Sequence, residues 1–151
     1  MIGIWIWKFP TTGLPWIKNN GYNSTCKKSD SGVWPHRGEI HLAALDPAIG
    51  HEIKKTRPVL IVQNDASNRY GFITMAAPIT STVRLPLSPV HVLLPAGPVT
   101  GLAVPSVAVF NQIRAIDRRR LLKKLGKADA SVMSQADLAI QVAFGLPDSI
   151  G

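Results

Sequence analysis

The sequence predicts a mainly β domain, a small barrel of short strands, followed by one C-terminal helix. Between residues 38 and 113, short apolar and β-branched runs alternate with turn-forming residues. This spacing is typical of a small barrel rather than of an α/β layer. After Asp129 the apolar residues recur at intervals of three and four, which indicates an amphipathic helix.

The composition suits one compact, basic domain. A chain of 151 residues with 46% hydrophobic and 17% charged residues can bury a real core, which argues against disorder of the whole. Its 17 Lys and Arg residues oppose 9 Asp and Glu residues, so the formal net charge is +8 and the pI is near 10.1. Such an excess favours a polyanionic partner, either nucleic acid or an acidic protein segment.

The single cysteine and the apolar start of the chain bear on its compartment. Cys26 has no second thiol to pair with, which excludes an intrachain disulfide and a cysteine-rich zinc site and favours the reducing cytoplasm. The apolar residues 2–7 follow no basic leader, and Lys8 and Pro10 end the run far short of a membrane-spanning segment. We therefore expect a cytoplasmic protein with no membrane association.

The chain divides into three parts. Residues 1–35 are interpreted as a poorly ordered N-terminal extension, because residues 18–32 are almost wholly polar and follow no strand or helix period. The alternative, an arm whose tryptophans and lysines bind RNA or a partner, stays open. Residues 36–146 form the predicted domain, and residues 147–151 form a C-terminal tail.

The first strand is predicted over residues 38–45, where one face carries Ile40, Leu42 and Ala44 and the other, polar face carries Glu39, His41 and Ala43. Turn-forming residues 46–50 lead into a basic turn that ends at Arg57 and Pro58, and the apolar strand of residues 59–62 follows. Residues 63–68 are then a polar break.

The next strand is predicted over residues 72–77 and ends at residues 78–81. Arg57 enters the strand before it and Thr80 leaves this one. If the two strands pair antiparallel, Arg57 and Thr80 meet at the same end of the sheet.

Prolines interrupt the chain after Thr80. Residues 90–94 are a short apolar strand between prolines, which predicts an edge of the sheet. A further strand is predicted over residues 106–113, with Gln112 and Asn111 on opposite faces.

The C-terminal helix is predicted to begin after the N-cap Asp129 and to stop at Gly145, with Pro147 beyond it. Before it, residues 118–124 carry the densest charge in the chain. This basic run has two interpretations, a phosphate-binding patch and a solvated helical turn.

Several segments, in their order and spacing, resemble the MazF/PemK family of toxin ribonucleases across residues 36–146. They are RGEI at 37–40, LDP at 45–47, GHE at 50–52, KTRPVLIV at 55–62, ND at 64–65, PIT at 78–80 and QIRAID at 112–117.

This resemblance implies an SH3-like barrel, the fold shared by MazF and CcdB toxins. It implies the toxin component of a type II toxin-antitoxin system, a metal-independent and sequence-specific endoribonuclease that needs no cofactor. The implied substrate is single-stranded RNA, cut to 2′,3′-cyclic phosphate and 5′-hydroxyl ends. The implied partners are a second copy of the chain, in a homodimer, and a cognate antitoxin with an acidic disordered tail.

Arg57 and Thr80 match the catalytic positions of that family. The arginine guanidinium is permanently charged and can grip two phosphate oxygens, and the threonine hydroxyl can donate to the same oxygens. Because arginine is a poor general base at neutral pH, we assign Arg57 charge stabilisation and leave its part in proton transfer open. The candidate RNA-binding residues are Glu52, Lys54, Lys55, Asn64, Ser81 and Gln112.

Glu52, Asn64 and Gln112 also have structural interpretations. Glu52 can orient Arg57 or hold its loop, since a carboxylate beside a phosphate path is unfavourable. Asn64 and Gln112 can read base edges through their amides or can cap strand ends.

Three other functions stay open. His51 and His91 can form an acid/base pair, because imidazole titrates near neutrality. A non-catalytic gyrase inhibitor resembling CcdB would bind through its C-terminal helix and would not need Arg57 and Thr80. A plain RNA-binding barrel would bind RNA without cutting it.

Overall fold

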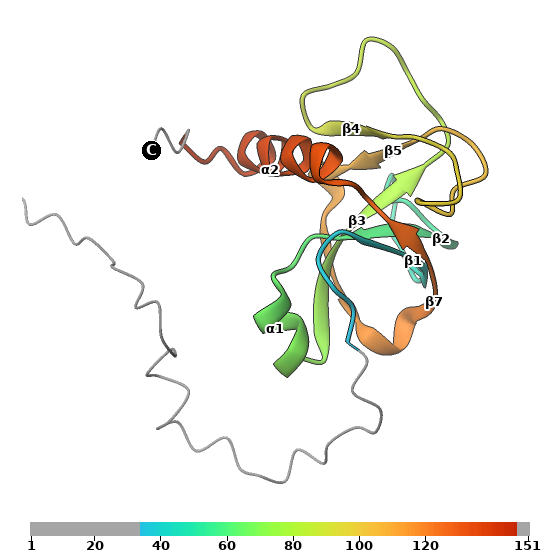
Figure 1. Ribbon diagram of the computed structural model, residues 1–151, viewed down its shortest axis with the longest axis vertical. Coiled ribbons are helices and arrows are strands. Elements are labelled where there is room, and N and C mark those ends of the chain that lie inside the picture. The colour runs from blue at the N-terminus through green and yellow to red at the C-terminus, as the bar shows by residue number, and fades with distance from the viewer. Residues whose placement is uncertain (1–33, 148–151) are drawn as a thin grey trace, which may run out of the picture. The chain divides into compact units, whose positions relative to one another are not determined.

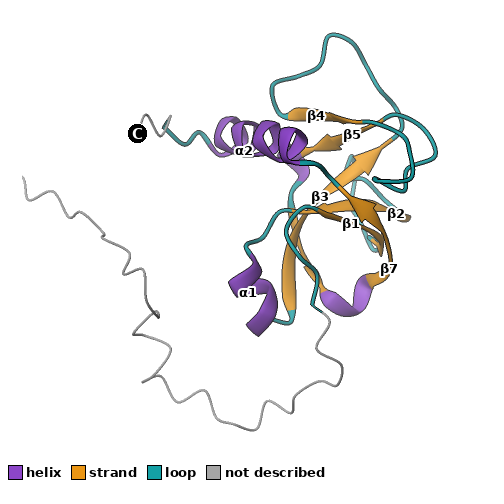
Figure 2. Ribbon diagram, in the orientation of Figure 1, coloured by secondary structure: helices purple, strands orange, loops and turns teal. Residues whose placement is uncertain are grey.

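A computed structural model describes residues 34–147 of the 151-residue chain (Figure 1). The expectations for residues 1–33 and 148–151 lie outside the described residues. The predicted class, mainly β with a C-terminal helix, is confirmed (Figure 2). In chain order the elements are β1 (Glu39–Ala44), β2 (Thr56–Ile61), α1 (Asp65–Tyr70), β3 (Ile73–Thr80), β4 (His91–Leu94), β5 (Ser106–Val109), the 3-10 turn η2 (Phe110–Gln112), β6 (Arg114–Asp117), the 3-10 turn η3 (Arg118–Arg120), β7 (Leu121–Lys127) and α2 (Ala130–Phe144).

The strands form one antiparallel sheet in the order β4-β5-β3-β2-β1-β7, with β6 paired to β3. β3 is the branching strand: residues 73–76 pair with β6, residues 76–78 with β2, and residues 79–80 with β5. The expectation that residues 90–94 form an edge strand is confirmed by β4, which lies at one end of this order. Closure of the sheet into a barrel stays a prediction.

Both faces of the central strands are buried, which explains the continuous apolar run in β2. Leu60 packs in a core cluster with residues of β3, β4, β5 and α2, while Val59 and Ile61 pack in a second cluster with Ala43 and Ala76. The alternation expected in β1 is therefore wrong in one respect. Ala43, placed on the polar side, is fully buried because the second cluster covers that face.

The predicted C-terminal helix is confirmed in its span and its caps. The Asp129 side chain accepts a hydrogen bond from the Val132 amide, and Gly145 ends the helix in the left-handed conformation, at φ 62°. Val132, Ala136 and Ala139 are buried in the larger core cluster. Neither α1 nor α2, the α-helices of residues 34–147, has the length and hydropathy needed to cross a bilayer.

Four sequence expectations differ from the structure. The strand expected over residues 72–77 begins at Ile73 and continues through Pro78 to Thr80. The strand expected over residues 106–113 ends at Val109, where the chain turns into η2 before β6. The polar break after Gln63 contains α1, capped by Asn64. The basic run is not a helical turn alone, because it forms η3 and most of β7, and its phosphate-binding interpretation stays a prediction.

Candidate active site

The pairing of β2 with β3 brings Arg57 and Thr80 to the same end of the sheet. Val59 of β2 pairs with Pro78 of β3, and Leu60 pairs with Ala77. The ladder between the two strands ends at Val59 and Pro78, so Arg57 and Thr80 lie at the same end of the sheet, two residues beyond the last pair. The conditional expectation that the two strands pair antiparallel is confirmed.

The hydrogen bonds of Arg57 and Thr80 leave their reactive groups available. Arg57 Nε donates to the Lys54 carbonyl at 3.0 Å, and within residues 34–147 its Nη atoms make no hydrogen bond. The Thr80 hydroxyl oxygen accepts from the Thr82 amide at 3.2 Å, so its proton can still be donated. Both side chains are half-buried, which restricts their motion without removing them from solvent.

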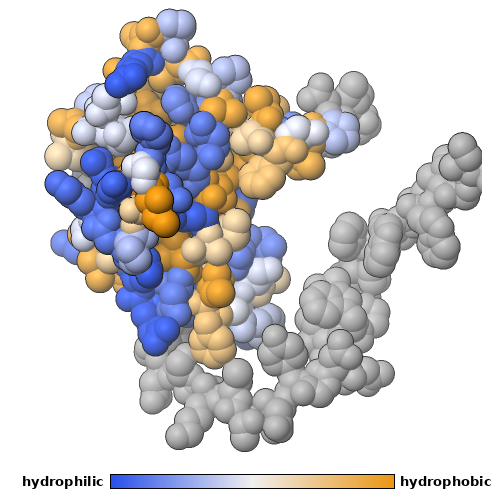
Figure 3. Space-filling model, turned by 180° about the vertical axis from the view of Figure 1, so that it is seen from behind, coloured by the Kyte–Doolittle hydropathy of each residue, from blue (hydrophilic) through white to orange (hydrophobic). Residues whose placement is uncertain are grey.

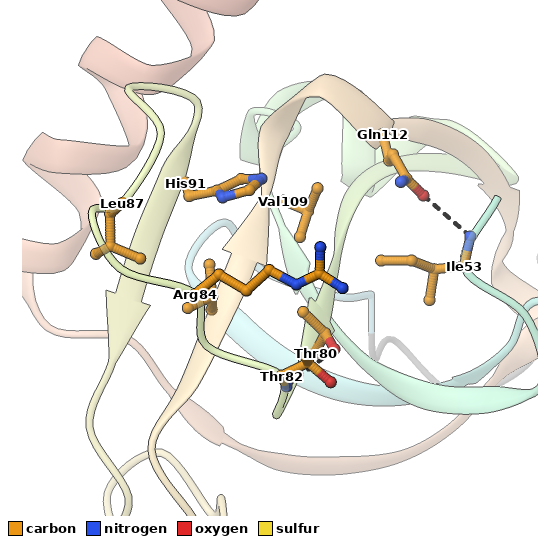
Figure 4. A pocket seen from close by; sticks show the side chains of 9 residues that line it. Ile53, Thr80, Thr82, Arg84, Leu87, His91, Val109 and Gln112 are labelled. Atoms are coloured by element: carbon orange, nitrogen blue, oxygen red, sulfur yellow. Dashed lines mark hydrogen bonds between the residues drawn. The ribbon is translucent and has the colours of Figure 1, made fainter. Parts of the chain in front are cut away.

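Thr80 opens into a pocket of about 370 Å³ (Figure 4). Arg84 lies across this pocket, between Thr80 and Thr82 on one side and Gln112 on the other. Arg57 is not among the residues that line it. The pocket is open to solvent, and apolar and polar side chains both line it. Its lining residues are Ile53, Thr80, Thr82, Arg84, Leu87, His91, Val107, Val109 and Gln112.

Two predicted RNA-binding residues hold the loop of residues 45–55. Gln112 Oε1 accepts a hydrogen bond from the Ile53 amide at 3.0 Å. Glu52 Oε2 accepts from Arg114 Nη2 at 3.1 Å and from the Ile49 amide at 3.2 Å. Their side-chain oxygens are thus engaged within the protein, although Gln112 also faces the pocket.

Lys54 and Lys55 lie on the exposed rim of the same loop. The Lys55 backbone adopts φ 69°, and its amide donates to Asp46 Oδ1 at 3.0 Å. This turn keeps both ammonium groups outside the core, on the side of β2 where Arg57 begins the strand.

Ser81 and Asn64 lie at opposite ends of the sheet. Ser81 is exposed and directly follows Thr80 at the end of β3. Asn64 lies beyond the other end of β2, where its Oδ1 accepts from the Ser67 amide at 2.8 Å and caps α1. Seven residues separate it from Arg57, roughly 20 Å along an extended strand. The structure therefore does not bring Asn64 together with the other candidates.

The two histidines occupy different places. His91, on β4, lines the pocket, whereas His51 is exposed in the loop of residues 45–55. No hydrogen bond joins them in the part of the chain that the structure describes. Within residues 34–147, no group of three or more His, Cys, Asp or Glu side chains is placed to hold a metal ion.

Arg84, Thr82 and Arg114 were not singled out in the sequence. Arg84 and Thr82 lie in the proline-rich segment after β3, where no periodicity marks a residue as functional. Arg114 lies in the QIRAID segment, two residues after Gln112, and that position was a usable signal. It is the ion-pair partner of Glu52.

The basic run of residues 118–124 is largely committed to internal contacts. Arg118 Nη1 donates to the Gly71 carbonyl, and Arg120 Nη1 donates to the Asp46 carbonyl. Hydrogen bonds from Arg119 hold the pKa of Asp117 at about 2, well below its usual value. Seen from behind, hydrophilic residues cover much of this face of the described chain (Figure 3).

Comparison with known proteins identifies the family. Residues 36–144 match the family described as PemK-like, MazF-like toxin of type II toxin-antitoxin system. The chain belongs to this family. The Endoribonuclease EndoA of Bacillus subtilis (strain 168) is 37% identical over 112 residues, which cover 74% of this chain and 96% of that protein. The predicted domain boundaries at residues 36 and 146 stay predictions.

Solved structures of MazF proteins share this fold. MazF from Deinococcus radiodurans superposes with a TM-score of 0.64 at 28% identity, covering 75% of this chain and 98% of that one. A mycobacterial endoribonuclease in complex with its cognate antitoxin superposes with a TM-score of 0.61 at 25% identity, covering 75% and 97% of the two chains.

Proposed function

We propose that this MazF-like toxin is an endoribonuclease that cuts single-stranded RNA at specific sequences without a metal ion. The observation that supports the proposal is the antiparallel pairing of β2 with β3, which brings Arg57 and Thr80 to the same end of the sheet, with Thr80 lining a pocket. The name of the related EndoA supports the reaction class.

In the proposed reaction, the ribose 2′-oxygen attacks the adjacent phosphorus and the bond from phosphorus to the 5′-oxygen breaks. The 2′-hydroxyl proton is lost and the leaving 5′-oxygen gains one, so the products are a 2′,3′-cyclic phosphate and a 5′-hydroxyl. Arg57 and Thr80 stabilise the negative charge that builds up on the phosphoryl oxygens. The free Nη atoms of Arg57 suit this role because they can grip two oxygens at once.

Lys54, Lys55 and Ser81 are proposed to bind the RNA on either side of the cut. They are exposed and flank the positions of Arg57 and Thr80 along the chain. The pocket that Thr80 lines has both apolar and polar side chains. It therefore suits an unstacked nucleobase, whose faces are apolar and whose edges form hydrogen bonds.

The proposed protein partners are a second copy of the chain and a cognate antitoxin. Leu138, Val142 and Phe144 are exposed apolar side chains on α2, and they support a homodimer interface. An antitoxin with an acidic disordered tail suits the basic groups around Arg57 and Arg84, and a related mycobacterial protein is solved with its antitoxin. A cytoplasmic location is part of the same proposal.

RNA cleavage in EDTA tests the proposal. The wild type is expected to cut a long single-stranded RNA in the presence of the chelator and to leave 5′-hydroxyl ends. Arg57→Ala and Thr80→Val should each lower the cleavage rate about 100- to 1000-fold, the cost of removing a donor that stabilises transition-state charge. Arg119→Gln, which removes a charge from an exposed ion pair, is the matched control.

The other outcomes point to the alternatives. A folded wild-type protein that does not cut RNA contradicts the proposal and favours a gyrase inhibitor or a plain RNA-binding protein. Cutting that Arg57→Ala retains and His91→Ala abolishes would move the active site to the histidine in the pocket. Cutting that EDTA abolishes would require a metal ion.

A further inference from the structure

We propose that Arg114, together with Gln112, is a positioning residue that sets the orientation of Arg57 through the loop of residues 45–55. The inference rests on the proposed role of Arg57 in RNA cleavage. We call the contacts of Gln112 and Arg114 with Glu52 and Ile53 the Ile53 clamp.

The Ile53 clamp holds both backbone polar groups of one loop residue. Gln112 Oε1 accepts from the Ile53 amide at 3.0 Å, and Arg114 Nη1 donates to the Ile53 carbonyl at 3.4 Å. Arg114 Nη2 also donates to Glu52 Oε2 at 3.1 Å. The clamping side chains come from the last residue of η2 and the first residue of β6, 59 and 61 residues further along the chain.

The Ile53 side chain anchors the same residue from the inside. It packs against the core cluster that contains Val59 and Ile61 of β2. Ile53 is therefore fixed through its amide, its carbonyl and its side chain, whereas the residues on either side of it in the loop, Glu52 and Lys54, are exposed. A loop residue held at three points defines the path of the residue that follows it.

That following residue is Lys54, whose carbonyl accepts the hydrogen bond from Arg57 Nε at 3.0 Å. Because the peptide units are planar, only the φ and ψ angles of Lys54 separate the clamped Ile53 carbonyl from the carbonyl that holds Arg57. The bond engages Nε and leaves the two Nη atoms free, which is the arrangement that a bidentate grip on phosphate requires. The clamp thus acts on the guanidinium through Lys54.

The exposure of the clamp argues against a mainly stabilising role. The Glu52 side chain is 52% exposed and that of Arg114 is 26% exposed. Ion pairs this close to solvent contribute little to the free energy of unfolding. Loss of Arg114 is therefore expected to appear in the rate of cleavage rather than in the melting temperature.

Cleavage kinetics of the full chain test the proposal. Arg114→Gln should lower kcat about 10- to 100-fold, the usual cost of a small misplacement of a reacting group. KM, the melting temperature, and the Kd for an RNA with a 2′-deoxy residue at the scissile position should stay near the wild-type values. Arg114→Lys should restore part of the rate because an ammonium can still donate to Glu52 or Ile53. Arg119→Gln removes the same charge from a neighbouring exposed pair and should match the wild type.

Two kinetic outcomes would overturn the proposal. A rise in KM and Kd with an unchanged kcat would make Arg114 a direct RNA contact. A loss of rate that parallels a fall in melting temperature, and that Arg114→Lys does not relieve, would make its role structural.

A second measurement does not depend on cleavage. The Arg57 Nε proton can be followed in 1H–15N spectra and assigned by its disappearance in Arg57→Lys. Its exchange with water should be at least about tenfold faster in Arg114→Gln than in the wild type or Arg119→Gln, because opening of a hydrogen bond governs exchange. Unchanged exchange would overturn the clamp whether or not the protein cuts RNA. A protected Nε proton in a wild type that cuts no RNA would overturn the proposed function alone.

Discussion

The Asn64 side chain is committed to the first turn of α1. Its Oδ1 accepts from the Ser67 amide at 2.8 Å, and its carbonyl accepts from the Asn68 amide at 3.0 Å. Asp65, the next residue, accepts from the Arg37 amide, which lowers the pKa of its carboxyl. These contacts tie α1 to the start of β1 at the end of the sheet away from Arg57. We therefore infer that Asn64 contributes to stability rather than to RNA contact.

Substitution of Asn64 separates the two interpretations. Asn64→Ala should lower the free energy of unfolding by about 1 kcal/mol, because an N-cap side chain is lost. Asn64→Asp keeps an accepting oxygen and should recover most of that loss. Urea denaturation measures the first effect, and RNA cleavage by all three proteins should be equal. A shift in the cleaved sequence with unchanged stability would instead assign Asn64 to base recognition.

At the scale of elements, the sequence predicted the parts that carry a long or strongly apolar signal. The β2 strand was predicted because its buried residues form a continuous apolar run, and α2 because its apolar residues recur at intervals of three and four. The α1 helix has six residues, too few for a helical period to emerge, and β7 reads as a basic run because most of its side chains are exposed. Gly126, within β7, also gave no strand signal. Only glycine fits at this position, because a Cβ there would lie 2.2 Å from the Val99 carbonyl oxygen.

The candidate site likewise has one part that the sequence could predict and one part that it could not. The Arg57 and Thr80 pair was predictable because an antiparallel register needs only two adjacent strands. The contacts of Gln112 and Arg114 with the loop of residues 45–55 were not, since they join segments about 60 residues apart and depend on where η2 turns the chain. The sequence could mark Gln112 and Arg114 through the QIRAID segment, but it could not show that their side chains hold this loop.

The pairing of β1 with β7 is predicted to depend on pH through Glu39. Burial raises the pKa of Glu39, but hydrogen bonds from Lys124, His41 and the His36 amide outweigh it, and the pKa falls to about 2 from the usual 4.5. A carboxyl with a lowered pKa in the folded protein stabilises it fully above about pH 4.5. That contribution is lost as the pH falls toward 2.

Comparison with Glu39→Gln measures this effect. At pH 7 the free energy of unfolding of the variant should be lower than that of the wild type by about 1 to 3 kcal/mol. This difference in free energy should become smaller as the pH falls from 4.5 to 3, and it should fall most steeply toward pH 3. Urea denaturation of both proteins at several pH values gives the gap directly. A difference that stays constant down to pH 3 would contradict the assigned cause, and 1 M salt should reduce the part due to the half-exposed Lys124.

At the scale of the whole molecule, the positive charge is shared between two parts of the chain. Residues 1–33 contain four lysines and one aspartate, a net charge of +3, so the remainder carries +5 of the total +8. Both parts can attract RNA at long range, since association with a polyanion depends on summed charge. Only phosphate contacts, however, release counterions and set the salt dependence of the affinity.

The salt dependence therefore tests whether residues 1–33 act as an RNA-binding arm. We predict that the full chain and a chain of residues 34–151 bind a non-cleavable 2′-deoxy-substituted RNA with the same slope of log Kd against log salt, and cut the same sequence. If all four lysines of the first part bound phosphates, removing them would reduce the slope by about 3, since each contact contributes about 0.7 for single-stranded RNA. Fluorescence anisotropy between 50 and 300 mM NaCl resolves a change of about one contact. A reduced slope with an unchanged cleavage sequence would make residues 1–33 a non-specific RNA-binding arm, whereas a changed sequence would make them part of the recognition site.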